Sequence, residues 1–326
     1  MENPYGWPTE FMAGWLERLR DAKLNRYPPP DAPLLKARLR DVMAIPHDSS
    51  LILGNGSDEL IQLIILALAG PGRVVLAPEP SFTMYRLISQ FVGMEYVGVP
   101  LQAADFTLDG DAMLTAMEQY RPVVVFLAYP NNPTGNRFEP HQVNEIIAAA
   151  PGLVVIDEAY FAFAEHSFLH SLPRYDNLLI MRTLSKMGLA GLRLGLLLGA
   201  ERWLTEFEKL RLPYNINILT QISAEFMLSH HEVLDDQIRR IRRDRADLHA
   251  VLTKLPGITV YPSETNFILL RTLPGEGERL ATALHKAGIL IKNLNRAGEL
   301  LSDCLRVTVG TSDENRAFVA ALKAAL

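Results

Sequence analysis

Short, mainly apolar runs recur through the first two-thirds of this chain, and they constrain its fold more than any other feature. They lie at residues 51–53, 73–77, 123–128, 153–156, 178–181 and 196–198. Runs this short, without alternating polar positions, are typical of strands in a parallel sheet that is covered on both faces. The order of strand, helix and strand therefore predicts an α/β fold with a mainly parallel sheet and helices on both faces.

After Gly199 the pattern changes. We expect helices at 201–210, at 219–255 with a break near 229–231, at 277–287 and at 313–325, and strands at 266–271 and 304–309. Helices and strands in this arrangement predict a smaller α+β domain. A chain of 326 residues also suggests two domains. We expect an N-terminal arm at 1–30, a large domain at 31–225 and a small C-terminal domain at 226–326.

The arm is rich in proline and in turn-forming residues. A helix is expected inside it at 9–23, with Thr9 as the N-cap, and a second helix follows at 33–42. The segment is too short to form a domain of its own.

Charge and composition exclude several classes of partner. The net charge is −5, and we find no long run of lysine and arginine, so we expect neither a nucleic-acid nor a membrane partner. The longest apolar stretch, at 60–69, is shorter than the ~20 residues of a membrane span. A single cysteine suits a reducing compartment, and we expect a cytoplasmic protein. His166 and His170 lack the glutamate of a metal-binding helix, so we expect no metal site.

Lys186 lies in a loop between two of the apolar runs. The chain has no other lysine between Lys36 and Lys209, although arginine is frequent there. A lone lysine in a turn is usually a surface residue. A lysine held between core strands is, however, well placed to form a Schiff base with pyridoxal phosphate, and arginine cannot replace it in that role. Such a site also requires a phosphate cradle, a carboxylate for the ring nitrogen and an aromatic face.

Candidates for the phosphate cradle, the carboxylate and the aromatic face lie directly after the other apolar runs. The turn at 54–59, with Ser57 as the N-cap of a helix, has free N–H groups for a phosphate, although a plain capped helix is the alternative. Phe82 or Tyr85 could stack on a ring, or either could belong to the core. Asn132 is held between prolines, and Asp157 ends a buried strand, where it requires a partner such as a pyridinium or a helix N-terminus.

With these residues in view, the sequence resembles the fold-type I pyridoxal-phosphate aminotransferases, and within them the histidinol-phosphate aminotransferase family. The resemblance covers nearly the whole chain. Each motif is weak alone, but their order is specific. They are Glu2-Asn3-Pro4-Tyr5-Gly6, Asn25-Arg26-Tyr27-Pro28, Gly56-Ser57-Asp58-Glu59, Pro80-Ser81-Phe82, Asn131-Asn132-Pro133-Thr134-Gly135, Asp157-Glu158-Ala159-Tyr160, Thr183-Leu184-Ser185-Lys186, Ser263-Glu264-Thr265-Asn266 and Leu305-Arg306-Val307-Thr308-Val309-Gly310.

The resemblance implies a role for each residue of the site. Lys186 would bind pyridoxal 5'-phosphate as a Schiff base and later move a proton, while Asp157 would pair with the ring nitrogen. The phenolic oxygen would accept from Asn132 and Tyr160, and Phe82 would stack on the ring in place of the more usual tyrosine. The phosphate would be held by the backbone N–H groups of Ser57 and Asp58 together with Thr183, Ser185 and Arg193, with Tyr27 reaching it from a second subunit.

The same resemblance implies substrates and an assembly. Arg306 would bind the acidic group of each substrate, with Arg316 near it. The expected reaction transfers an amino group between histidinol phosphate and 2-oxoglutarate in histidine biosynthesis, in a homodimer whose N-terminal arm packs with the small domain and the partner subunit.

Other functions remain open at this point. An aromatic amino-acid aminotransferase and a threonine-phosphate decarboxylase share the fold. A non-catalytic regulator would require a DNA-binding domain ahead of this chain. A nicotinamide dehydrogenase is disfavoured, because the turn at 54–59 lacks the third glycine of the dinucleotide-binding fingerprint.

Overall fold

The computed structural model of the chain describes residues 3–46 and 49–326. Glu2, which opens the first of the motifs named above, lies outside the described residues.

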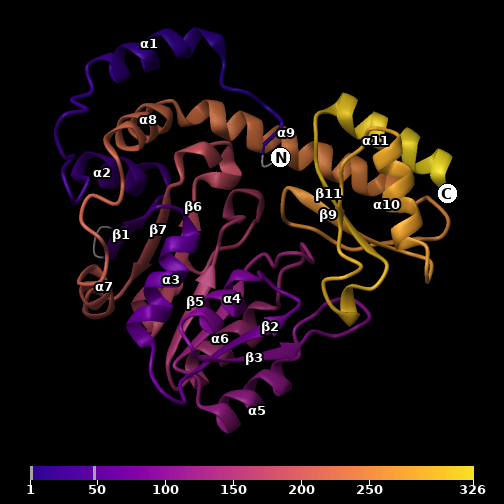
Figure 1. Cartoon of the computed structure of the whole chain (residues 1–326), viewed down its shortest axis with the longest axis horizontal. Helices are drawn as coiled ribbons and strands as arrows, with labels where there is room; N and C mark the ends of the chain where they lie inside the picture. The colour runs from indigo at the N-terminus through magenta and orange to yellow at the C-terminus, as the bar shows by residue number, and fades with distance from the viewer. Residues whose placement is uncertain (1–2, 47–48) are drawn as a thin grey trace.

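Within this part of the chain, seven strands form one sheet in the order β1-β7-β6-β5-β4-β2-β3 (Figure 1). Strands β2 to β6 pair in parallel, whereas β7 runs antiparallel to both of its neighbours. The mainly parallel sheet predicted from the apolar runs is confirmed. The strands are β1 (Ser50–Gly54), β2 (Val74–Glu79), β3 (Glu95–Pro100), β4 (Val124–Ala128), β5 (Leu153–Asp157), β6 (Leu178–Thr183) and β7 (Gly195–Gly199).

Helices cover both faces of this sheet, because alternate side chains of each strand feed two separate cores. Val125 and Leu127 of β4 belong to one core, and Val124 and Phe126 belong to the other. The first core includes residues of α2 (Pro33–Val42), α5 (Gly110–Tyr120), α6 (Pro140–Ala149) and α8 (Ile218–Ser229). The second includes residues of α3 (Ser57–Leu68), α4 (Met84–Phe91) and α7 (Glu201–Glu208).

A second, antiparallel sheet follows in sequence, in the order β10-β11-β9-β8. Its strands are β8 (Ile258–Val260), β9 (Phe267–Thr272), β10 (Lys292–Asn293) and β11 (Cys304–Thr308). Together with α10 (Gly277–Lys286) and α11 (Ser312–Ala325), it encloses a third core. None of the described helices combines the length and the hydrophobicity that crossing a bilayer requires.

The long helix α9 (His231–Leu252) connects the two sheets. Leu234 and Ile241 pack in the core of the large sheet, whereas Leu248 and Leu252 pack in the core of the small one. Figure 1 shows α9 extending between the two parts. The predicted helix break near 229–231 is confirmed, since α8 ends at Ser229 and α9 begins at His231.

The N-terminal segment lies against this connection. The Asn3 side-chain amide donates to the Met187 carbonyl at 3.1 Å and to Gln237 Oε1 at 2.9 Å, and the Tyr5 hydroxyl donates to Asp244 Oδ2 at 3.0 Å. It therefore joins the loop after β6 to α9.

Helix α1 (Thr9–Arg20) follows, and it differs from the prediction at both ends. Thr9 is the first residue of the helix, because Pro8 supplies the extended N-cap conformation. The helix also ends at Arg20, three residues before the expected Lys23.

Candidate active site

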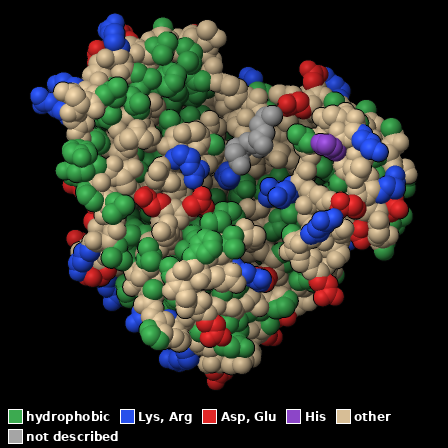
Figure 2. Space-filling view, in the orientation of Figure 1, with side chains coloured by type: hydrophobic (Ala, Val, Ile, Leu, Met, Phe, Trp, Pro, Cys, Tyr) green, Lys and Arg blue, Asp and Glu red, His purple; other side chains and the backbone are tan. Residues whose placement is uncertain are grey.

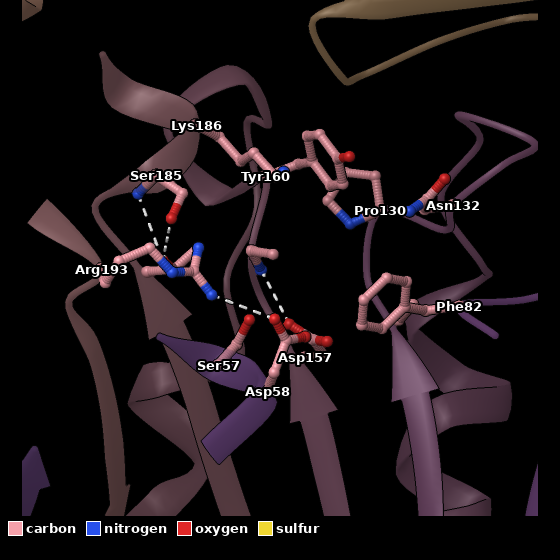
Figure 3. A pocket seen from close by; sticks show the side chains of 13 residues that line it. Ser57, Asp58, Phe82, Pro130, Asn132, Asp157, Tyr160, Ser185, Lys186 and Arg193 are labelled. Carbon is pink, nitrogen blue, oxygen red and sulfur yellow. Dashed lines mark hydrogen bonds and ion pairs between the residues drawn. The ribbon is translucent and has the colours of Figure 1, made fainter. Parts of the chain in front are cut away.

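One edge of the large sheet gathers the ends of its strands. Ala128 of β4 pairs with Asp157 of β5, and Gly195 at the start of β7 pairs with both Thr183 and Gly54. An open cavity of about 520 Å³, its mouth included, lies there (Figure 3). This is where open α/β sheets bind ligands. It is lined by Ser57, Asp58, Phe82, Ala128, Pro130, Asn132, Asp157, Ala159, Tyr160, Thr183, Ser185, Lys186 and Arg193.

Lys186 lies in a single 3-10 turn, Ser185–Met187, directly after β6. The turn ends at Gly188, whose φ of +119° favours glycine. Lys186 is half-buried, and its Nζ lies 5.6 Å from the centre of the Tyr160 ring. Figure 3 shows its side chain extending toward Tyr160 and Pro130. The turn thus presents an amine to the cavity from the end of a buried strand.

Hydroxyl and guanidinium groups gather on one side of the cavity. The Thr183 hydroxyl lies 3.0 Å from Ser185 Oγ, and it accepts from the Ser185 N–H at 3.2 Å. Arg193 Nη2 donates to Asp58 Oδ2 at 3.1 Å, across the first turn of α3. The sequence predicted all four of these residues as parts of a phosphate cradle.

The start of α3 corrects one detail of that prediction. Ser57 is the first helical residue, and Gly56 is the N-cap with a φ of +88°. A Cβ atom at Gly56 would lie 2.6 Å from Arg193 Nη2, so glycine is what lets the guanidinium approach the helix terminus. Backbone N–H groups, a guanidinium and hydroxyls form a donor set suited to a phosphate dianion, and these residues fit the phosphate of pyridoxal phosphate.

Asp157 ends β5 and is only 4% exposed. Its carboxylate accepts from the Tyr85 hydroxyl at 2.6 Å and from the Ala159 N–H at 3.1 Å. Burial raises the pKa of Asp157 to about 6, while the bond from Tyr85 and the charge of Lys186 act to lower it. A buried carboxylate that faces a cavity is suited to bind a cationic ring nitrogen entering that cavity.

The structure places the two aromatic candidates, Phe82 and Tyr85, in different surroundings. Phe82 lines the cavity, whereas Tyr85 is fully buried and stacks on Phe126 with ring centres 4.6 Å apart. Phe82 packs edge-on against Tyr85. Only Phe82 therefore presents a ring face to a ligand. Sequence reasoning missed the hydrogen bond from Tyr85 to Asp157, because no local pattern joins residues so far apart in the chain.

Arg306 and Arg316, which the resemblance assigned to substrate, and Tyr27, which it assigned to the partner's cofactor phosphate, occupy three different places. Arg306 lies on β11, donates from Nη1 to the Asn132 side chain, and stacks over the Phe267 ring at 4.6 Å. It therefore approaches the cavity through Asn132.

Tyr27 is 80% exposed and stacks on Tyr214.

Arg316 is not brought to this cavity. It forms an ion pair with Asp313 on α11 and lines a separate groove against α9. The spacing of ten residues between Arg306 on β11 and Arg316 on α11 gave no information on the direction in which the helix would point the Arg316 side chain.

A buried ion pair lies beside the cavity-lining residues. Glu158 follows Asp157, and Arg182 precedes Thr183. Glu158 Oε2 accepts from Arg182 Nε at 2.9 Å, and the two side chains are 0% and 4% exposed. Glu158 also accepts from the Ser167 hydroxyl and, at 2.6 Å, from the Phe168 N–H. The pair ties the ends of β5 and β6 together.

Comparison with known proteins identifies a family and similar relatives for this chain. The sequence matches the family described as aminotransferase class I and II over residues 2–322. Histidinol-phosphate aminotransferase 2 of Nitrosococcus oceani is 58% identical over 324 residues, covering 99% of this chain and 90% of that protein.

Solved structures agree on the fold. The histidinol-phosphate aminotransferase from Clostridium acetobutylicum gives a TM-score of 0.90 at 24% identity, covering 99% of this chain and 96% of that one. The enzyme of the same name from Sinorhizobium meliloti, solved in complex with pyridoxal-5'-phosphate, gives 0.89 at 24% identity, covering 99% and 88%. At this identity the comparison addresses architecture, and it confirms the fold-type I arrangement predicted from the sequence.

Proposed function

This chain belongs to the class I and II aminotransferase family, and from that membership we propose that it transfers an amino group between histidinol phosphate and 2-oxoglutarate, with pyridoxal 5'-phosphate as cofactor. The observation that carries the proposal is the convergence of Lys186, Asp157 and the Ser57–Arg193 cradle on one cavity. The identity of 58% to a histidinol-phosphate aminotransferase favours this substrate over an aromatic amino acid or threonine phosphate.

Each residue has a task that follows from its place. Bound pyridoxal phosphate supplies an electron sink for the carbon that loses a proton. Ser57, Thr183, Ser185 and Arg193 would hold its phosphate. Asp157 would keep the ring nitrogen charged.

The remaining residues would orient the ring and move the proton. Phe82 would pack on one face of the ring, and Asn132 and Tyr160 would direct hydrogen bonds to its phenolic oxygen. The amine of Lys186 would hold the cofactor's aldehyde carbon between turnovers and then carry the proton between substrate and cofactor.

Substrate binding is assigned to Arg306. A guanidinium can bind either a carboxylate or a phosphate bidentately, so one arginine could serve glutamate and histidinol phosphate in turn. Its present bond to Asn132 supports this role, because it places the guanidinium beside a residue that lines the cavity.

The cofactor is tested by titrating the purified protein with pyridoxal phosphate. The wild type should develop the visible absorbance of a lysine-bound cofactor. Lys186→Ala should not, whereas Lys209→Ala, which removes an exposed lysine paired with Glu206, should match the wild type. A wild-type protein that stays colourless would contradict the proposal.

The substrate is tested in single half-reactions. Histidinol phosphate, phenylalanine, tyrosine and threonine phosphate are each offered to the pyridoxal form. We expect the highest specificity constant with histidinol phosphate, and we expect Arg306→Ala to impair both histidinol phosphate and glutamate. Preference for an aromatic amino acid, or release of carbon dioxide from threonine phosphate, would reassign the enzyme within its family.

A homodimer is proposed together with this function. Tyr27 is one of several strongly exposed apolar side chains, and Leu24, Leu34 and Leu212 are each about 70% exposed. Figure 2 shows hydrophobic side chains gathered on the side of the molecule that carries α1, α2 and α8. Apolar groups exposed together in this way are typical of a surface that a second subunit covers.

The role of Tyr27 can be tested with mixed dimers. If it completes the partner's phosphate site, mixing inactive Lys186→Ala subunits with Tyr27→Ala subunits restores one intact site per mixed dimer. Full activity of a sedimenting monomer would contradict the dimer.

A cytoplasmic location is proposed as well, because the one cysteine, Cys304, is buried and leaves no internal disulfide.

A further inference from the structure

We infer that Tyr85 is a positioning residue, which holds the Asp157 carboxylate in its charged form and aims it at the cavity. The inference rests on the role proposed above for Asp157. Tyr85 itself does not line the cavity, so its hydroxyl would act on the reaction only through that carboxylate.

The geometry fixes the hydroxyl in place. Tyr85 lies in the first turn of α4 and is 0% exposed. Its ring is stacked on Phe126 with an interplanar angle of 13°, and Phe82 packs against its edge at 5.7 Å. The phenol therefore has little freedom to rotate. Its oxygen lies 2.6 Å from Asp157 Oδ2, the length of a charge-assisted O–H···O bond.

The groups around this contact determine the pKa values of Asp157 and Tyr85. Burial raises the pKa of Asp157, and Asp58 on α3 adds to the rise, while Lys186 and the bond from Tyr85 oppose it. Burial and the nearby Asp157 raise the pKa of Tyr85 well above its usual range, with smaller contributions from Tyr96 and Tyr160. Tyr85 thus keeps its proton and acts as a donor. Without the Tyr85 hydroxyl, the pKa of Asp157 would rise further, and the carboxyl group would keep its proton to a higher pH.

Tyr85→Phe removes only this donor, and the chain offers a matched control. Tyr129 is also 0% exposed, and within residues 3–46 and 49–326 its hydroxyl is buried without a hydrogen-bond partner. Tyr129→Phe therefore deletes a buried phenol oxygen just after the neighbouring strand β4, and the backbone bond from the Tyr129 N–H to the Asp157 carbonyl at 2.9 Å is unaffected. Any general effect of losing a hydroxyl from this core should appear in both variants.

The first measurement uses the cofactor-free protein, so it does not depend on catalysis. A carboxyl group whose pKa is raised on folding, here from 3.8 to about 6, makes stability fall as pH rises between those values. In Tyr85→Phe the folded pKa rises further, so the fall should continue above pH 6. The difference in unfolding free energy from the wild type should grow with pH for Tyr85→Phe and stay flat for Tyr129→Phe.

The second measurement uses the loaded enzyme. For Tyr85→Phe we expect kcat to fall about tenfold or more at pH 7, as for loss of a hydrogen bond to a charged group, and to recover toward the wild-type value at pH 9. The acid limb of the kcat profile should move to higher pH. In an Asp157→Asn background, Tyr85→Phe should have no more effect than Tyr129→Phe, because the charge it supports is gone.

The outcomes separate this inference from the proposed function. If the wild type binds no pyridoxal phosphate, the function fails, and the pH dependence of stability still tests the contact. If Tyr85→Phe behaves like Tyr129→Phe at every pH, or loses activity equally at all pH values, the inference is overturned. Should Tyr85→Phe fail to fold while Tyr85→Phe/Asp157→Asn folds, the contact is supported. Failure of both would assign Tyr85 a purely structural role.

Discussion

Asp157 and Glu158 are adjacent in sequence and equally deep in the protein, yet their carboxylates meet different surroundings. Asp157 faces the cavity and is held by a phenol and a backbone N–H. Glu158 is 0% exposed and is bonded to Arg182, Ser167 and the Phe168 N–H. Depth alone therefore does not separate a carboxylate that lines the cavity from one that is paired inside the core. The two carboxylates differ because their side chains point to different sides of the end of β5.

Asp157→Asn should give the largest effect. We expect kcat to fall by about 10³-fold or more, because the amide cannot balance charge that develops in the transition state. Stability of the cofactor-free protein at pH 8 should not fall, since folding disfavours the ionised form of Asp157. Stopped-flow half-reactions and urea unfolding measure the two quantities. Asp176→Asn, at an exposed ion pair, is the control.

Glu158→Gln should show the reverse pattern. It leaves the Arg182 guanidinium buried without its anion, which typically costs about 3–5 kcal/mol of unfolding free energy. Activity per folded molecule should change much less than in Asp157→Asn. Adding Arg182→Met should recover part of the lost stability. A large loss of kcat without loss of stability would erase the distinction between the two carboxylates.

The titration of Asp157 should make the stability of the cofactor-free protein depend on pH. Relative to Asp157→Asn, the cofactor-free wild type should lose up to about 3 kcal/mol as pH rises from about 4 to about 6, because the folded pKa lies above the unfolded one. Urea unfolding at several pH values measures this loss, and equal slopes in wild type and Asp157→Asn would refute the assignment.

Ser167→Ala should give the smallest effect. It removes one donor to Glu158 and one acceptor for Arg182, which should cost about 1–2 kcal/mol of stability. The affinity for pyridoxal phosphate should remain unchanged, because Ser167 lies outside the cavity. Ser302→Ala, at an exposed serine, controls for the substitution. A weakened affinity would mean that the ion pair tunes the cavity directly.

The residues at strand ends could be predicted from the sequence, because each follows an apolar run and parallel strands finish at the same edge. Lys186, Asp157 and Asn132 were identified in this way. The helix caps were harder to predict. Ser57 and Thr9 are favourable N-caps by residue type, but Gly56 and Pro8 take the non-helical position, since backbone conformation determines where a helix begins.

Contacts between distant elements could not be predicted. Tyr85 reaches Asp157 across 72 positions of sequence, and Arg306 reaches Asn132 across 174. Such pairs depend on how helices and sheets pack after they form. Arg316 illustrates the same limit, because the turn of α11 directs it into a separate groove against α9.

The docking of the N-terminal segment has a consequence for biosynthesis. Asn3 bonds to the Met187 carbonyl, and Tyr5 shares Asp244 with Ser312, which lies close to the end of the chain. The N-terminal segment therefore waits for residues up to Ser312 before it finds all of these contacts. During translation the turn that carries Lys186 would form before α9 is made, and it would acquire its final environment only after residues 237–312 have been synthesised.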